Sequence, residues 1–344
     1  MQSEKYSREN AGQSLKKYIL LKKGELAYNH GASKYKPFGC CFELKEEEAR
    51  IPYVYHCFAV KENNDKSYIA RLLNNQKIDQ QLKRLISSSV RMDGLLNISY
   101  EEYTGIDLYL PSLPEQQKIA AFLSLVDVRI EKQRKLVENL KKYKRGLFLK
   151  LYNDSDKSII SFKNIYEMAS EGGTPSTSDS ENYENGKIPF IKIDDLNQHY
   201  LNFAKYFITE KGLKKSSAWI VPENSIIYSN GATIGACSIN KIPVTTKQGI
   251  LGIVPKSNFS VEFLYFLFTS SIFKQKIRAI TTKGTMDSAY LKDINGIKIS
   301  IPDFIAQQKI AKIMVDFENL IERTELSFIY LQNIKKALLQ QMFI

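Results

Sequence analysis

PSLPEQQKIAAFLSLVDVRIEKQRKLVENLKKYKRGLFLKLY, residues 111–152, decides the fold of this chain, because it returns in altered form 191 residues later. The second copy, residues 302–343, reads PDFIAQQKIAKIMVDFENLIERTELSFIYLQNIKKALLQQMF. Both copies contain Gln-Gln-Lys-Ile-Ala, at 116–120 and at 307–311. A proline stands at the start of each copy, at Pro114 and Pro302, which favours the beginning of a helix there. A repeat of this kind sets the architecture before any single motif is considered.

Each copy carries apolar residues at alternating spacings of four and three. In the first copy these are Ile119, Leu123, Val126, Ile130, Val137, Leu140, Leu147 and Leu151. In the second they are Ile310, Met314, Phe317, Ile321, Phe328, Leu331, Leu338 and Met342. A mean spacing of 3.5 residues is typical of a coiled-coil seam, and each helix would be roughly 55 Å long.

Polar residues interrupt both seams at the same two places, Gln133/Thr324 and Lys144/Lys335. Matched interruptions predict that the two helices are partners of each other, since either seam left in water would expose a large apolar surface. The alternative is a pair of ordinary amphipathic helices, each packed on its own domain.

Weaker repeats connect the regions ahead of the two helices. Residues 28–33, Tyr-Asn-His-Gly-Ala-Ser, resemble residues 228–233, and Met92-Asp93 resembles Met286-Asp287. The second region alternates short β-rich runs with turns and has one helical stretch, Ser260–Ile280, which predicts a mixed α+β domain. We therefore expect four parts: residues 1–110, the helix 111–152, residues 153–301 and the helix 302–344. Only 27 residues precede Tyr28, so we expect the first region to lack roughly 40 residues that the second one has.

Composition favours an acidic partner. The net charge is +12 and the isoelectric point about 9.2, which indicates nucleic acid first and an anionic membrane surface second. A generic basic protein stays open on charge alone. The chain has no apolar run of about 18 residues for a membrane span, and its first ten residues lack the apolar core of a secretory signal. Cys40, Cys41, Cys57 and Cys237 have neither zinc-site spacing nor disulfide density, so we expect a cytoplasmic location.

The order of globular region, long helix, second region and second helix resembles the specificity subunit of Type I restriction–modification enzymes. The resemblance is carried by residues 110–127 with 140–152, and by Gly172-Gly173-Thr174-Pro175-Ser176. Asn230-Gly231-Ala232-Thr233-Ile234-Gly235 and Thr246-Lys247-Gln248-Gly249 add to it. The short front of the first region departs from the family's pattern and puts the reading of one half-site in doubt.

The resemblance implies two target-recognition domains, each reading one half of a bipartite double-stranded DNA sequence. It implies an antiparallel packing of the two helices, which fixes the spacer between the half-sites. Two methyltransferase subunits and the restriction/translocase subunits would be the partners. S-adenosylmethionine, ATP and Mg²⁺ would be used by those partners, and this chain would hold no cofactor.

Catalytic motifs are missing from the sequence. It has no Asn/Asp-Pro-Pro-aromatic motif, no glycine-rich cofactor loop after a strand and no P-loop. His30, His56 and His199 are isolated, so no metal cluster is expected. Glu43-Leu44-Lys45 matches the tail of a nuclease motif, but no upstream Pro-Asp accompanies it. We therefore expect a non-catalytic chain.

Candidate DNA contacts are small, polar and cationic residues on loops, because such groups reach phosphates and base edges. In the second domain we predict Gly172, Gly173, Thr174, Ser176, Thr246, Lys247, Gln248, Lys283, Gly284 and Thr285, with free backbone N–H groups of the segment 172–176 offered to a phosphate. In the first domain we predict Asn29, Lys34, Ser88, Ser89 and Arg91. Each loop taken singly could also be a solvated turn.

The cationic run Lys141–Arg145 could be a solvated helix face or could attract DNA or an acidic partner. Arg129 and Arg134 are candidate docking positions on the same helix. The alternative function is a coiled-coil DNA-binding or adaptor protein that forms a homodimer through its helices, without a methyltransferase.

Overall fold

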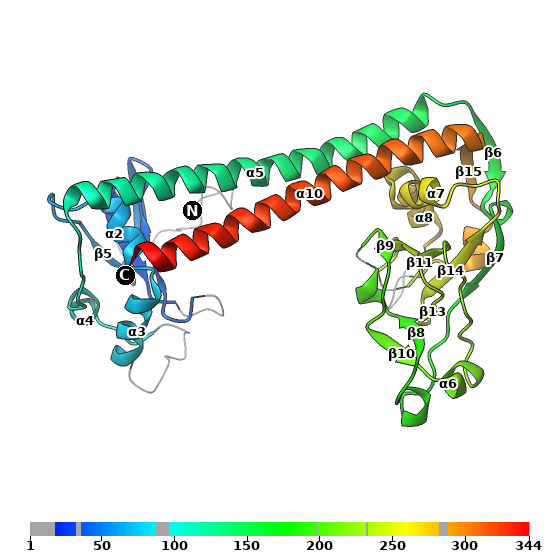
Figure 1. Ribbon diagram of the computed structural model, residues 1–344, viewed down its shortest axis with the longest axis horizontal. Coiled ribbons are helices and arrows are strands. Elements are labelled where there is room, and N and C mark those ends of the chain that lie inside the picture. Colours follow the sequence, from blue (N-terminus) through cyan, green and yellow to red (C-terminus); the bar gives the residue numbers. More distant parts are fainter. Residues whose placement is uncertain are drawn as a thin grey trace. The chain divides into compact units, whose positions relative to one another are not determined.

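The computed structural model describes residues 18–31, 36–86, 96–196, 198–231, 233–281 and 288–343. The chain forms two compact units (Figure 1). Unit 1 comprises residues 1–135 and 325–344, and unit 2 comprises residues 136–324. The boundaries cut both long helices near their middles, so each unit contains one half of each helix together with one globular region. Among the described residues, no helix is both long and apolar enough to cross a membrane.

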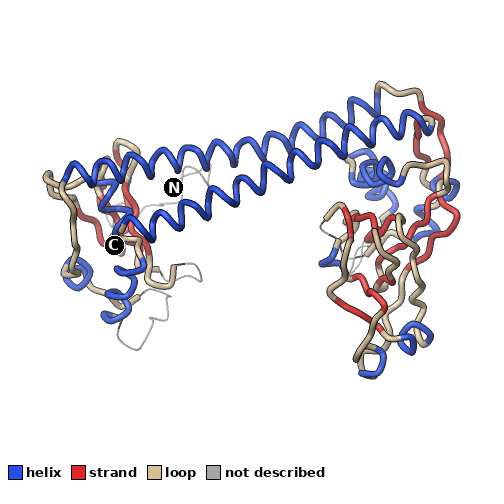
Figure 2. The backbone as a smooth tube through the Cα atoms, viewed as in Figure 1, coloured by secondary structure: helices blue, strands red, loops and turns tan. Residues whose placement is uncertain are grey.

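The two long helices are α5 (Leu113–Asn153) and α10 (Phe304–Met342), the long blue coils of Figure 2. In unit 1, Asp127 of α5 pairs with Lys335 of α10, and Ala120 and Leu123 share an apolar cluster with Phe343. In unit 2, Lys144 pairs with Glu318, and Phe148 lies in one cluster with Met314. Residue numbers rise along one helix while they fall along its neighbour, so the packing is antiparallel.

The predicted seam is confirmed. Every apolar seam position of both helices is buried or half-buried, although these helices carry many exposed apolar side chains elsewhere. Of the polar interruptions, Thr324 is buried and its hydroxyl donates to the Leu320 carbonyl oxygen, whereas Lys144 and Lys335 form ion pairs across the seam. The expected fold class, two α+β regions with two long antiparallel helices, is therefore confirmed.

Unit 2 is built around a five-stranded sheet. Its order is β7 (Tyr166–Glu171), β14 (Ile250–Pro255), β11 (Ile226–Ser229), β12 (Cys237–Asn240) and β9 (Tyr200–Leu201). A smaller sheet has the order β10 (Tyr206–Ile208), β8 (Ile188–Ile191) and β13 (Thr245–Thr246). A third pair joins β15 (Lys298–Pro302) to β6 (Lys157–Ser161). The shorter elements are η2 (Phe162–Asn164), η3 (Ser180–Asn182), η4 (Ile193–Asp195), α6 (Glu210–Lys214) and α9 (Leu291–Ile294).

The core of unit 2 gathers on helix α7 (Val261–Thr269), which is followed by α8 (Ser271–Ile280). Residues 263–268 of α7 occupy every side of the helix, and all of them are buried. A helix buried on every side belongs to a domain interior. Each such side chain contributes roughly 1.5–3 kcal/mol through burial, so α7 anchors the sheet to the long helices.

Unit 1 has a three-stranded sheet in which β2 (Leu26–Asn29) lies between β3 (Cys40–Glu43) and β5 (His56–Phe58). Strands β1 (Tyr18–Lys22) and β4 (Glu48–Pro52) form a separate antiparallel pair. The helices of its globular region are α2 (Lys66–Leu72), α3 (Gln76–Leu85) and α4 (Tyr100–Thr104).

The two globular regions share one plan. Strand β2 pairs with β3 and β5 as β11 pairs with β12 and β14, and Tyr28 faces Cys41 as Tyr228 faces Cys237. Helices α2 and α3 correspond to α7 and α8. The N-cap residue of α2, Asp65, stands 195 residues before that of α7, Ser260. The N-cap residues of α3 and α8, Asn75 and Ser270, are separated by the same interval. The weak sequence repeat ahead of the long helices therefore reflects a repeated structure.

Candidate nucleic-acid interface

Three segments of unit 2 meet in one loop platform: Glu171–Ser176, Asn230–Gly231 and Thr246–Gly249. The N–H of Gly249 donates to Glu171 Oε1 at 2.6 Å, and the N–H of Gln248 donates to Thr174 Oγ1 at 3.4 Å. The Gly231 N–H donates to the Gly249 carbonyl oxygen at 3.2 Å. The structure thus brings together the glycine-rich segment and the Thr-Lys-Gln-Gly segment that the sequence indicated separately.

Glycine is required at two positions of the platform. At Gly172, a Cβ atom would lie 2.0 Å from the backbone oxygen of Thr246, so any larger residue would push the two segments apart. Gly249 has φ +84°, a left-handed conformation that residues with a side chain rarely adopt. These glycines let the segments touch and turn the following strand back into the sheet.

Three predicted contact residues have a supporting role instead. Gly172, Gly173 and Thr246 are buried, the Gly172 N–H donates to the Ile250 carbonyl oxygen at 2.9 Å, and Thr246 Oγ1 donates to that same oxygen at 3.1 Å. The expectation that the Gly172 N–H is offered to a phosphate is therefore wrong, because close packing of the two segments consumes that donor.

Four predicted residues are exposed on the platform: Thr174, Ser176, Lys247 and Gln248. The platform directs their side chains outward because its backbone is fixed on both sides. The Lys247 N–H donates to the Ile191 carbonyl oxygen at 3.0 Å, which joins the platform to the end of β8. A cation, an amide and two hydroxyls on one rigid surface form a donor set that suits phosphate oxygens and base edges.

Lys192 extends this donor set and was missed by the sequence reasoning. It directly follows β8, next to the carbonyl group that holds Lys247, and its Nζ lies 3.6 Å from the ring centroid of Tyr206. The aromatic ring stabilises the ammonium group in one position. In the sequence, Lys192 falls within the β-rich run Ile188–Ile193.

The other predicted contacts cannot be placed. Lys283, Gly284 and Thr285 lie outside the described residues, as do Lys34, Ser88, Ser89 and Arg91. Asn29 is described: it is half-buried at the end of β2, and its Oδ1 accepts from the Gly31 N–H at 2.9 Å. The described ranges contain no group of three or more histidines, cysteines or carboxylates placed to hold a metal ion.

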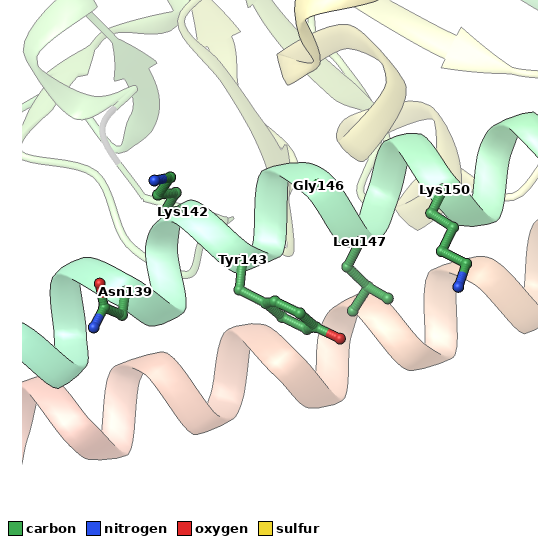
Figure 3. Close-up of a pocket in the computed structure, with 6 residues that line it drawn as sticks. All are labelled: Asn139, Lys142, Tyr143, Gly146, Leu147 and Lys150. Atoms are coloured by element: carbon green, nitrogen blue, oxygen red, sulfur yellow. The ribbon is translucent and has the colours of Figure 1, made fainter.

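A second surface lies on α5 in unit 2. A pocket of about 380 Å³ is lined by Asn139, Lys142, Tyr143, Gly146, Leu147 and Lys150 (Figure 3). Tyr143 and Leu147 point toward α10, and the Tyr143 ring lies 5.6 Å from that of Phe317. Gly146 leaves a gap in the helix surface, since no atom lies within 4 Å of where its Cβ would be. In the cationic run Lys141–Arg145, Lys144 forms an ion pair with Glu318. The other cationic residues of the run, Lys141, Lys142 and Arg145, are exposed.

Comparison with known proteins bears on the loop platform. Residues 155–330, which include the whole loop platform, match the family described as the Type I restriction modification DNA specificity domain. The chain belongs to this family. The sequence resemblance is thereby confirmed over half of the chain, and the platform lies inside the family's own domain.

Two specificity subunits from other organisms are similar in sequence to this chain. The chain is 33% identical over 192 residues to the specificity subunit of the MjaIX enzyme of Methanocaldococcus jannaschii, covering 55% of this chain and 44% of that protein. It is 30% identical over 153 residues to the EcoR124I/EcoR124II specificity subunit of Escherichia coli, covering 43% and 38%. The matched part therefore spans less than half the length of either relative.

Solved structures support the fold. An S subunit from M. genitalium gives a TM-score of 0.54 at 18% identity, covering 96% of this chain and 85% of that one. A structure described for complex assembly and conformational transition of the type I R-M system gives 0.62 at 14% identity, covering 94% and 82%. The alternative of a homodimer formed through unpaired helices is not supported, because each half-helix packs on the other helix of its own chain.

Proposed function

We propose that this chain is a DNA-recognition subunit of a Type I restriction–modification enzyme. The observation that carries the proposal is the rigid platform of exposed Thr174, Ser176, Lys247 and Gln248 within the family's specificity domain. Gln248 is the candidate for base readout, since a side-chain amide can pair bidentately with adenine, and Lys247 is the candidate for a phosphate. The net charge of +12 supports a polyanionic ligand.

The test is the affinity of the purified chain for duplex DNA, measured by fluorescence anisotropy at a series of KCl concentrations. Each neutralised phosphate releases counterions, so the logarithm of the association constant should fall linearly with the logarithm of the salt concentration. Absence of binding, or an affinity that salt does not change, would count against the platform.

The proposed role includes assembly with methyltransferase subunits and restriction/translocase subunits in the cytoplasm. Those subunits would carry out methyl transfer from S-adenosylmethionine, ATP hydrolysis and Mg²⁺-dependent cleavage, and this chain would remain non-catalytic. The long helices support such a scaffold because they expose apolar side chains away from their seam. In unit 1 these are Phe122, Leu125, Val128, Ile329 and Tyr330, and in unit 2 Leu136, Ile313 and Leu320.

Exposed apolar side chains in rows on a helix pair are typical of a protein-binding surface, and Leu125 at 69% exposure is the clearest example. Size-exclusion chromatography with light scattering should show a complex of this chain with two copies of its methyltransferase. Leu125→Asp should weaken that complex, while Lys132→Asp, at an exposed polar position of the same helix, should not. A chain that ignores the methyltransferase would contradict the scaffold role.

A further inference from the structure

A lysine and an aspartate of unit 2 contact the same tyrosine beside the loop platform. The Lys192 Nζ lies 3.6 Å from the ring centroid of Tyr206. The hydroxyl of this tyrosine donates to Asp194 Oδ2 at 3.4 Å. Tyr206 therefore holds a cation with its ring and an anion with its hydroxyl, so that a hydrogen-bond donor and an acceptor lie on one support. We call these three residues the Tyr206 cluster.

The small sheet joins the Tyr206 cluster to the loop platform. Strand β10, which contains Tyr206, pairs with β8, and β8 pairs with β13. The platform residue Lys247 directly follows β13, and its N–H donates to the Ile191 carbonyl oxygen at 3.0 Å. Lys192 is the next residue after Ile191. The cluster and the platform are thus held by one hydrogen-bonded backbone framework.

The turn that carries Lys192 and Asp194 is fixed by a different carboxylate, that of Asp195. Asp195 is only 4% exposed, and its Oδ2 accepts from the Lys192 N–H at 2.9 Å across the 3₁₀ turn η4. Its Oδ1 lies 3.6 Å from Lys205 Nζ. Because Asp195 supplies the carboxylate that this turn needs, the turn does not depend on Asp194.

The Asp194 side chain, by contrast, is 52% exposed. Its ionic contact is with Lys205, whose Nζ lies 3.8 Å from Asp194 Oδ2 and whose side chain is 51% exposed. An ion pair so accessible to water contributes little to stability. Beside a surface that binds phosphates, an exposed carboxylate is repelled by the DNA backbone, and it gains from the duplex where it accepts from a base amino group.

The two charges of the cluster match one kind of base pair. Across the major groove, a G·C pair presents two adjacent acceptors, guanine N7 and O6, and then the cytosine N4 amino donor. Lysine suits the guanine acceptors, and a carboxylate suits the cytosine amino group. An A·T pair places its amino donor between two acceptors, so a carboxylate bound there would face an acceptor on each side.

We propose that Lys192 and Asp194 read one G·C base pair in the major groove, with Lys192 at guanine and Asp194 at cytosine. Tyr206 is a positioning residue, because it contacts both charged groups. This inference rests on the proposed function and adds a second reading position to it. Gln248 of the platform suits adenine, whereas the Tyr206 cluster suits guanine and cytosine.

The test is selection from a randomised duplex library by the full chain and its variants. The unchanged chain should enrich a motif with at least one fixed G·C pair. Asp194→Asn should lower the preference for G·C at one such position about tenfold, because an amide no longer presents acceptors alone. Lys192→Met should relax the same position. Glu322→Gln, which removes an exposed carboxylate of α10, should leave every position unchanged.

Tyr206→Phe tests the positioning role. It keeps the ring beneath the Lys192 ammonium and removes the hydroxyl that holds Asp194. We expect it to relax the same position less than Asp194→Asn does and to leave the other positions of the motif intact. Relaxation of every position together would show a structural role of Tyr206 instead and would overturn its assignment.

Inosine identifies the groove that is read. An inosine·cytosine pair presents the same major-groove groups as G·C but lacks the guanine amino group of the minor groove. In a duplex of the selected motif, inosine in place of that guanine should leave the affinity of the unchanged chain the same, as measured by fluorescence anisotropy. A loss of affinity would place the contact in the minor groove and overturn the inference.

Two further results would overturn it. One is a motif whose G·C positions are all unaffected by Asp194→Asn, and the other is relaxation of different positions by Lys192→Met and Asp194→Asn. In both cases the chain still selects a motif, so the proposed function stands without this inference. A library in which the unchanged chain enriches no motif would overturn both.

Discussion

Lys335 and Asp127 form an ion pair across the helix seam of unit 1, with Lys335 Nζ 2.5 Å from Asp127 Oδ1. Lys144 and Glu318 form the equivalent pair in unit 2, and both the lysines and the acids stand 191 residues apart. The lysine that interrupts each apolar seam is thus paired with an acidic residue of the opposite helix. Such pairs fix the register of antiparallel helices, since a shifted helix would leave the lysine among apolar side chains.

Charge reversal tests this role at Glu318. Glu318→Lys should lower the free energy of unfolding by about 1 kcal/mol or more, because two lysines would then face each other across the seam. The double variant Lys144→Glu with Glu318→Lys should recover most of the loss, as measured by urea denaturation. Losses that simply add would show that the two residues do not interact.

The buried glutamine of each Gln-Gln pair joins a long helix to its globular region. Gln116 Oε1 accepts from the Asp65 N–H and Gln307 Oε1 accepts from the Ser260 N–H, both at 3.0 Å. Each donor is the N-cap residue of α2 or α7. Each glutamine also donates through Nε2 to a proline carbonyl oxygen, that of Pro111 or Pro302.

Replacement of these glutamines should be costly. Gln307→Ala leaves buried backbone groups unpaired and should lower the free energy of unfolding by about 1–3 kcal/mol. The adjacent Gln308 is exposed, so Gln308→Ala should change it by less than about 0.5 kcal/mol. Gln116→Ala and Gln117→Ala provide the same comparison in unit 1, again by chemical denaturation. Equal effects within a pair would contradict the assigned hydrogen bonds.

On the loop platform, Lys247 and Thr246 should differ in their contribution to DNA binding. Lys247→Ala should weaken binding to all duplexes similarly and reduce the salt slope by about 1, because one phosphate contact is lost. Lys256→Ala, at an exposed position directly after β14, should leave the slope unchanged. Thr246→Ala should act through stability, since its hydroxyl is buried against the Ile250 carbonyl oxygen. Anisotropy titrations with folded variants distinguish these cases.

Alkaline pH should destabilise the chain through its buried thiols. Burial raises the pKa of Cys41 from 9.0 to about 12, and burial also raises the pKa of Cys237. In the unfolded chain these thiols lose their protons near pH 9, while in the folded chain they keep them. The unfolded state therefore binds fewer protons between about pH 9 and 12, and the free energy of unfolding falls as pH rises through that range.

Urea denaturation at intervals above pH 8 measures this fall. Cys41→Ser removes one of the thiols and should make the decline less steep. A free energy of unfolding that stays constant above pH 9 would contradict the assigned burial of both thiols.

Periodicity and repetition predicted the helices well, because apolar residues at a mean spacing of 3.5 residues fit few structures other than packed helices. They could not predict which members of the loop platform are exposed. Gly172 and Thr246 are residue types that suit DNA contacts. In the structure their backbones touch each other instead, because the pairing of β14 with β7 brings the two segments together. Lys192 escaped notice because its neighbours on the platform are distant in sequence. The changing interval between repeats, 191 residues at Gln116 and 195 at Asp65, also hid the common plan of the globular regions.

The proposed function requires that the chain reads DNA sequence through the platform of unit 2. The most direct measurement is selection from a randomised duplex library by the purified chain, followed by sequencing of the bound fraction. We predict an enriched motif, and we predict that Gln248→Ala relaxes the preference at one base pair of that motif. Gln308→Ala, at an exposed position of α10 outside the platform, should leave the motif intact. A bound fraction with the composition of the input library would contradict the claim, as would a motif that Gln248→Ala does not alter.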